Sequence, residues 1–203
     1  MVAVFTLLDA IIQQLSLVFI SLTIGICLAA PLAILSVFYK RISYFVLTTI
    51  NMAQSIPSFA LVAIIVPLVG IGFLPAIAAI VLGSIVPIVK NMYIGLAKTD
   101  TALIDTGKGM GLTDLQIMRH IRLPLAYPAI FAGLKFSAII ANGIAVLTAI
   151  IGSGGLGRII FEGLASFNIN KTLSGAIPAI LIALSLDLIF SLAEKKLKSK
   201  AGY

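Results

Sequence analysis

Five stretches of the sequence are each long and apolar enough to cross a lipid bilayer as an α-helix. A helical crossing needs about 20 mostly apolar residues, because each residue advances the helix by about 1.5 Å. Backbone that faces lipid must satisfy its own hydrogen bonds, so these stretches predict helices rather than open sheets. They are residues 15–38, 44–69, 74–96, 127–151 and 172–192.

The small number of charged residues also indicates a membrane protein. Only 10% of the 203 residues are charged, against about 25% in an ordinary soluble domain, which is too few to cover a water-facing surface. Residues 1–203 therefore predict a single all-α membrane domain, a polytopic bundle of about five transmembrane helices.

Basic residues concentrate in alternate connections between the predicted spans. In the connections on the opposite side, the only basic residues are Arg158 and Lys171. By the positive-inside rule, the chain is a multi-pass protein of the cell membrane with its N-terminus outside and its C-terminus in the cytoplasm. This bias also explains the net charge of +7 without nucleic-acid binding. The inner segments hold Lys40, Arg41, Lys98, Lys108, Arg119, Arg122, Lys195, Lys196, Lys198 and Lys200.

Helix breakers and charges lie inside several spans. Prolines at five positions predict kinks packed against neighbouring helices or a wet cavity, with ordinary helix packing as the alternative. The intramembrane charges Lys90, Lys135 and Asp187 are costly unless paired or snorkelling. We expect Asp187 to neutralise Lys90 or Lys135 across helices; the alternative is that both lysines snorkel inward. The prolines are Pro31, Pro57, Pro67, Pro87 and Pro178.

The segment IGSGGLGR contains a G-x-G-x-x-G pattern at Gly152, Gly154 and Gly157. In a dinucleotide-binding site this pattern follows a strand and faces the cytosol. Here it follows an apolar helix on the predicted outer side, so nucleotide binding is not expected. The glycines instead predict a tight turn and close helix approach, followed by an amphipathic segment at the outer interface.

The predicted inner loop, residues 98–125, carries strong capping signals. Asp100 is placed to cap a short helix through Asp105, and Gly107, Gly109 and Gly111 are expected to break it. Thr113 and Gln116 form a capping box for a second helix, which we expect Pro124 to end. The loop is therefore predicted to be a helix-turn-helix element at the inner membrane face.

One stripe of the second helix must be buried against something. Leu115, Met118, Ile121 and Arg122 recur at three- and four-residue spacing, which places them on one face. That face packs either on the protein's own inner surface or on a partner. Periodicity alone favours the first.

The spacing in this loop resembles the cytoplasmic coupling motif of ABC importer permeases: Glu-Ala-Ala, three residues, Gly, nine residues, Ile-x-Leu-Pro. Asp105-Thr106-Gly107 departs from Glu-Ala-Ala but keeps the acid and the small third residue. The segments QSIPSFAL, PIVKNMYIGL, DTGKGMGLTDLQIMRHIRLPLAYPAIFAGLK and IGSGGLGRII are similar to permeases that import osmoprotectants such as glycine betaine, carnitine and choline. The positions that match the motif are Asp105, Thr106, Gly107, Gly111, Ile121, Leu123 and Pro124.

The resemblance implies the type I ABC importer permease fold and a set of partners. Two permease subunits, identical or paired with a homologue, would sit on two cytoplasmic ATPases, and an external substrate-binding protein, free, lipidated or fused, would deliver the ligand. The chain has no P-loop pattern. ATP and Mg²⁺ therefore belong to the partner ATPase, and this chain needs no cofactor and is not an enzyme. The expected ATPase-coupling residues are Asp105, Thr106, Gly107, Gly111, Leu115, Met118, Ile121, Arg122, Leu123 and Pro124.

The sequence says less about the substrate. A quaternary ammonium ion favours aromatic faces, yet the spans contain no tryptophan and no evident aromatic cage. High-affinity selection is then expected from the binding protein, with a weak, wide path in the permease. Ser55 and Pro57, at a bend in the second span, and Asn142 are the candidates for lining that path; each could equally be a satisfied group between helices. A methionine-type importer of another small amine or amino acid is the nearest alternative.

Other classes of protein fit the residues less well. Ser153 lies in the glycine-rich turn, but the only histidine, His120, lies in the inner loop on the opposite side, too far to activate it. No cluster of cysteine, histidine and carboxylate suggests a metal site. A stand-alone channel or secondary transporter would explain kinked spans but gives the inner helix-turn-helix no role.

Overall fold

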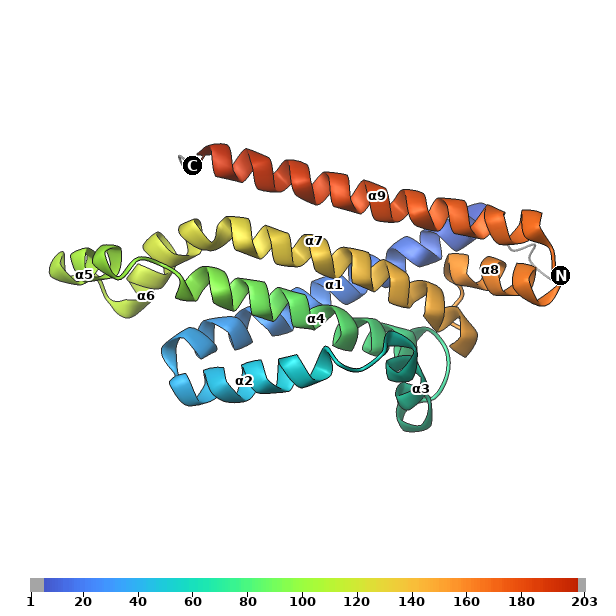
Figure 1. The fold of residues 1–203 in the computed structure, drawn as a ribbon, viewed down its shortest axis with the longest axis horizontal. Helices are drawn as coiled ribbons and strands as arrows, with labels where there is room; N and C mark the ends of the chain where they lie inside the picture. The colour runs from blue at the N-terminus through green and yellow to red at the C-terminus, as the bar shows by residue number, and fades with distance from the viewer. Residues whose placement is uncertain (1–5, 201–203) are drawn as a thin grey trace.

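The computed structural model describes residues 6–200, with side chains through residue 196, and the regular elements of this part of the chain are all helices. Four stretches of it are long and apolar enough to cross a membrane, and they lie lengthwise in one bundle (Figure 1). The third joins α6 (Asp114–Ile117), the π-helix η1 (Met118–Arg122), α7 (Leu123–Leu147) and the 3-10 helix η2 (Thr148–Ile151). The others are α1 (Leu7–Phe38), α4 (Phe73–Ala97) and α9 (Ile169–Lys200).

The second predicted span is not one straight helix. It is divided into α2 (Lys40–Ala53) and α3 (Ser58–Val69), which meet at an angle of 103°. Pro57 explains the break, because a residue before proline avoids helical backbone and proline itself donates no hydrogen bond. At the other prolines inside described helices the helix continues, so none of them divides its helix as Pro57 does.

The first helix begins earlier than predicted. Thr6 and Asp9 form a capping box, in which Asp9 N–H donates to Thr6 Oγ1 at 3.2 Å and Thr6 N–H donates to Asp9 Oδ2 at 2.9 Å. The polar residues Gln13 and Gln14 lie within this helix and bond to distant parts of the chain: Gln13 Oε1 accepts from the Gly155 N–H, and Gln14 Nε2 donates to Asn142 Oδ1.

Small residues let the long helices approach closely. A β-carbon at Gly95 in α4 would lie 2.8 Å from Ala129 Cβ in α7, and one at Gly133 would lie 3.0 Å from the Pro87 carbonyl oxygen. Association inside a membrane depends on such close contact, because lipid supplies no hydrophobic drive between helices. Two buried apolar clusters result, both built around α1, α4 and α7.

Different elements lie at the two ends of the bundle (Figure 1). α5 (Thr101–Gly109), α6 and the C-terminus lie at one end, together with the start of α2; α8 (Gly155–Ala165) and the start of α1 lie at the other. At the α8 end Glu162 accepts hydrogen bonds from Arg158 (2.8 Å) and pairs with Lys171 (2.9 Å). These two cations, Arg158 foremost, hold the pKa of Glu162 below its ordinary value. The pair of Glu162 with Lys171 joins α8 to α9, whereas Arg158 lies in α8 with Glu162.

Candidate functional site

The hairpin at the α5 end begins with the capping geometry that the sequence predicts. Asp100 Oδ1 accepts a hydrogen bond from the Ala102 N–H at 2.9 Å, and α5 follows. The turn contains Gly111 at φ +82°, a backbone conformation that favours glycine. Thr113 and Gln116 then form the expected capping box: the Gln116 N–H donates to Thr113 Oγ1, and the Thr113 N–H donates to Gln116 Oε1.

Two expectations about where this hairpin breaks are wrong. Gly107 lies inside α5, which ends only at Gly109. Pro124 does not end the second helix; it lies at the start of α7, and the helix runs on into the membrane span. The π-turn explains this, because the Leu123 N–H bonds to the Met118 carbonyl, five residues back, and such a widened turn accommodates a residue with no N–H.

The predicted stripe on the second helix divides into an internal and an external part. Met118 is only 2% exposed and belongs to the core cluster around α4. Ile121 packs on Gly107, where a β-carbon would lie 2.8 Å from Ile121 Cδ1. Arg122 Nη1 donates to the Leu96 carbonyl oxygen at 2.7 Å, which ties the hairpin to the end of α4. These three residues therefore hold the hairpin onto its own bundle and do not form a free docking stripe.

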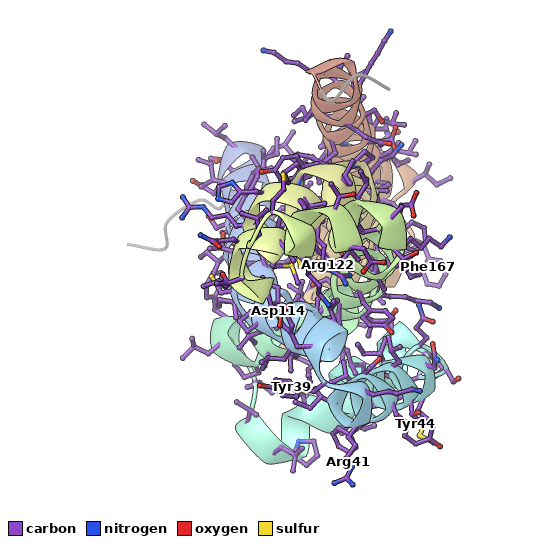
Figure 2. All side chains as sticks on the ribbon, turned by 90° about the vertical axis from the view of Figure 1, so that its left-hand side faces the viewer. Tyr39, Arg41, Tyr44, Asp114, Arg122 and Phe167 are labelled. Carbon is purple, nitrogen blue, oxygen red and sulfur yellow. The ribbon has the colours of Figure 1, made fainter. Side chains whose placement is uncertain are left out.

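The face left for a partner consists mainly of the hairpin tip. Asp105, Thr106 and Gly111 are exposed, and Leu115 is 73% exposed. Met110, 69% exposed beside the turn, is a further apolar contact that the periodicity of the second helix did not reveal, since it lies outside that helix. Figure 2 views the molecule from this end, with Asp114 and Arg122 in the foreground. Exposed apolar side chains with a polar rim are typical of a protein-binding surface.

Of the two lysines considered as partners for Asp187, Lys135 is the one in contact. Lys135 Nζ lies 2.8 Å from Asp187 Oδ1 and also donates to Ser191 Oγ at 2.9 Å, so α7 and α9 are joined by charge. Lys90 instead donates to Gln54 Oε1 at 3.2 Å, at the end of α2.

This geometry predicts an energetic coupling between Lys135 and Asp187. Asp187→Asn and Lys135→Gln are each expected to lower the thermal stability of the purified protein, because each leaves a charge without its partner. The double variant should recover about 0.5–1 kcal/mol of the summed loss. Asp187→Asn combined with Lys90→Gln is the control and should be additive; additivity in the first cycle would contradict the pairing.

A cavity of about 480 Å³ lies at the bend between α2 and α3. Ser55 and Pro57 are in the bend itself, and the neighbouring residues Gln54, Ile56 and Ser58 line the cavity. α2 measures about 21 Å at 1.5 Å per residue, which sets the bend part-way along the bundle and away from the hairpin end. Broken helices within a membrane expose backbone groups, and membrane transporters use them to form substrate sites. The opposite wall comes from α4 and α7 and includes Gly83, Pro87 and Phe136.

Asn142 does not lie on this cavity. It is 5% exposed, its Oδ1 accepts from Gln14 Nε2 at 2.8 Å, and its Nδ2 donates to the Ala179 carbonyl oxygen at 3.1 Å. The structure therefore favours the alternative for Asn142, a satisfied amide that joins α1, α7 and α9.

The glycine-rich turn is a packing element. Gly152, Gly154 and Gly155 all have positive φ, and the Gly155 N–H donates to Gln13 Oε1 at 3.0 Å. Gly157 lies against the backbone carbonyl of Val146, with no room for a β-carbon. Ser153 Oγ donates to Thr148 Oγ1 at 2.9 Å, at the end of the bundle opposite His120.

A many-helix membrane bundle, a solvent-facing hairpin tied to two spans, and a mid-bundle cavity at a broken helix together define a transport permease. Comparison with known proteins gives the family. Residues 11–199 match the model of the binding-protein-dependent transport system inner membrane component, and the chain belongs to this family. It is a multi-pass inner-membrane permease subunit of an ABC importer. ATP hydrolysis lies on partner chains, and the family works with ATPase and substrate-binding proteins.

Several relatives that the chain covers over most of their length are named for their substrates. The chain is 35% identical over 185 residues (91% of this chain, 85% of the relative) to the choline transport system permease protein OpuBB of Bacillus subtilis. It is 36% identical over 196 residues (95% and 90%) to the carnitine transport permease protein OpuCB of Listeria monocytogenes. It is 35% identical over 188 residues (93% and 87%) to the glycine betaine/carnitine/choline transport system permease protein OpuCB of Bacillus subtilis.

Solved structures show the same fold. The chain superposes on a structure of the MetNI methionine ABC transporter in an inward-facing conformation with a TM-score of 0.84 and 21% identity, covering 94% of this chain and 95% of the other. An amino acid ABC transporter solved with histidines gives a TM-score of 0.78 at 18% identity, covering 94% and 93%. The type I ABC importer permease fold expected from the coupling motif is thereby confirmed.

Proposed function

We propose that this permease imports small quaternary ammonium osmoprotectants such as glycine betaine, carnitine or choline. The observation that supports this most directly is the identity of about 35% over most of the chain to permeases named for these three substrates. The cavity of about 480 Å³ at the α2–α3 bend is large enough for a small solute. It is the proposed part of the path, with Ser55 and Pro57 shaping the bend.

The complex in this proposal has two permease subunits, identical or homologous, on two cytoplasmic ATPases that bind ATP and Mg²⁺. A substrate-binding protein delivers ligand at the α8 end, where the N-terminus is outside. This orientation is supported by the basic residues of the elements that meet at the hairpin end (Figure 1): Lys40 and Arg41 begin α2, Lys98 follows α4, and Lys108 and Arg119 lie in the hairpin.

The contacts of the hairpin with α4 and α7 suggest how the ATPases are coupled to the membrane spans. The exposed tip, with Asp105, Thr106, Gly111 and Leu115, contacts the ATPase, while Gly107, Met118, Ile121, Arg122, Leu123 and Pro124 connect the tip to α4 and α7. Because the second helix of the hairpin runs unbroken into α7, a displacement of the tip acts directly on that span. Closure of the ATPases is then transmitted to the helices that wall the cavity.

The test is uptake of labelled solute by proteoliposomes that contain the permease, its ATPase and its binding protein. We expect ATP-dependent accumulation of at least one of glycine betaine, carnitine and choline, and co-purification of the ATPase with the permease. Uptake of methionine or another amino acid in place of all three would overturn the substrate assignment. Conduction by the chain without an ATPase would overturn the importer mechanism.

A further inference from the structure

Lys90 places a positive charge beside the cavity with no carboxylate to neutralise it. Within residues 6–196, the ion pairs join Lys135 to Asp187 and Glu162 to Arg158 and Lys171, and none includes Lys90. Its ammonium donates a hydrogen bond to the neutral amide oxygen of Gln54, at 3.2 Å. A charge in a membrane span is costly, which makes an uncompensated one a candidate for function.

Two observations place Lys90 beside the cavity: its neighbours on α4 and its hydrogen-bond partner Gln54. On α4, Val86 and Pro87 line the cavity, and Lys90 follows them at four- and three-residue spacing, hence on the same helix face. Directly after α2, Gln54 lines the cavity and accepts a hydrogen bond from the ammonium. Lys90 is therefore at the edge of the cavity, where a solute inside would feel its charge.

The other residues that line the cavity suit a zwitterion, a solute with both a quaternary ammonium group and a carboxylate. Among the lining residues there is no carboxylate, and Phe136, 57% exposed, offers an aromatic ring of the kind that attracts quaternary ammonium groups. Lys135, next to Phe136 in sequence, is directed to Asp187 on α9. A simple cation would meet only repulsion from Lys90, whereas a carboxylate would be attracted to it, most strongly where water is scarce.

We propose that Lys90 is a specificity-determining residue that binds the carboxylate of a zwitterion and disfavours cations without one. The inference rests on the proposed function and narrows it: glycine betaine and carnitine, which carry a carboxylate, are bound in the permease in preference to choline, which does not. Gln54 positions the ammonium at the α2–α3 bend, and Phe136 faces the trimethylammonium group.

The experiment measures equilibrium binding of labelled glycine betaine and choline to the purified permease–ATPase complex, with the binding protein omitted so that its selectivity does not enter. Lys90→Gln removes the charge and retains a hydrogen-bond donor toward Gln54. It should weaken glycine betaine binding about tenfold, equivalent to about 1.4 kcal/mol, and leave choline binding unchanged or stronger. Lys90→Arg should retain the preference for glycine betaine. Lys98→Met, an exposed lysine at the end of the same helix, is the control and should change neither.

A second measurement needs no variant. The methyl ester of glycine betaine keeps the ammonium group and lacks the negative charge, so the wild-type complex should bind it about tenfold more weakly than glycine betaine. An equal loss of both ligands in Lys90→Gln, or equal binding of the ester and the zwitterion, would overturn the role of Lys90. So would failure of the wild-type complex to bind either ligand while the complete importer transports them. Failure of the complete importer to transport any osmoprotectant would instead overturn the proposed function.

Discussion

Asp105→Lys and Gly111→Trp are expected to leave the permease inserted and folded while abolishing stimulation of the partner ATPase by loaded binding protein. Both residues are exposed at the hairpin tip, so neither change disturbs the core. Asp105→Lys reverses a charge on the contact surface, and reversing a charge at an interface costs several kcal/mol through repulsion. Gly111→Trp places a bulky side chain at a φ of +82° in the turn, which both strains the loop and blocks approach of a partner. We expect stimulated hydrolysis to fall at least tenfold.

The matched control is Gly109→Ala. Gly109 lies two residues earlier at the end of α5, its φ is not positive, and a β-carbon there would meet nothing within 4 Å. It should retain coupling. The measurement is ATPase activity of the reconstituted complex with and without loaded binding protein, alongside size-exclusion profiles that verify assembly. Transport at the wild-type rate by Asp105→Lys would show that the tip does not contact the ATPase.

The sequence predicted the spans well because their length and hydropathy follow from the bilayer itself. The boundaries of α4 fall within one residue of the prediction, and α2–α3 is the exception. All the prolines look alike in a sequence, yet among the described helices only Pro57 marks a break, and α4 continues through Pro87. Near Pro87 the neighbouring helix α7 contacts the α4 backbone, because Ser137 Oγ donates a hydrogen bond to the Ser84 carbonyl oxygen at 2.7 Å. Tertiary contacts of this kind are not encoded in the local sequence.

In the candidate site, too, features that depend on local sequence were predicted and features that depend on tertiary contacts were not. The capping residues Asp100, Thr113 and Gln116 act locally and were predicted correctly. The predicted stripe is divided in the structure: Met118 and Arg122 contact the chain's own α4, as periodicity alone favoured, whereas Leu115 is exposed, and periodicity could not separate the two parts. Asn142 illustrates the limit most clearly, because its partner Gln14 is 128 positions away and only the fold reveals that the amide is satisfied.

The second large effect is expected at the last glycine of the G-x-G-x-x-G pattern. Gly157 in α8 packs directly on the Val146 carbonyl, and a β-carbon would also lie 2.7 Å from Ala149 Cβ. Backbone atoms cannot rotate away as a flexible side chain does, so Gly157→Val must force α8 off the end of α7. The cost should exceed about 3 kcal/mol, which is in the range that single substitutions reach only through overpacking or similar core damage.

Gly143→Ala is the corresponding control, because Gly143 is a helical glycine of α7 with nothing within 4 Å of its would-be β-carbon. The measurement is the yield and thermal midpoint of each purified variant in detergent. We expect Gly143→Ala to match the wild type and Gly157→Val to be recovered poorly or to melt well below it. The pattern would then be explained by helix packing alone, since a phosphate-binding glycine could be replaced without loss of the apo fold. Wild-type stability of Gly157→Val would mean that α8 does not rest on Val146, and the tight turn at the outer end would need another origin.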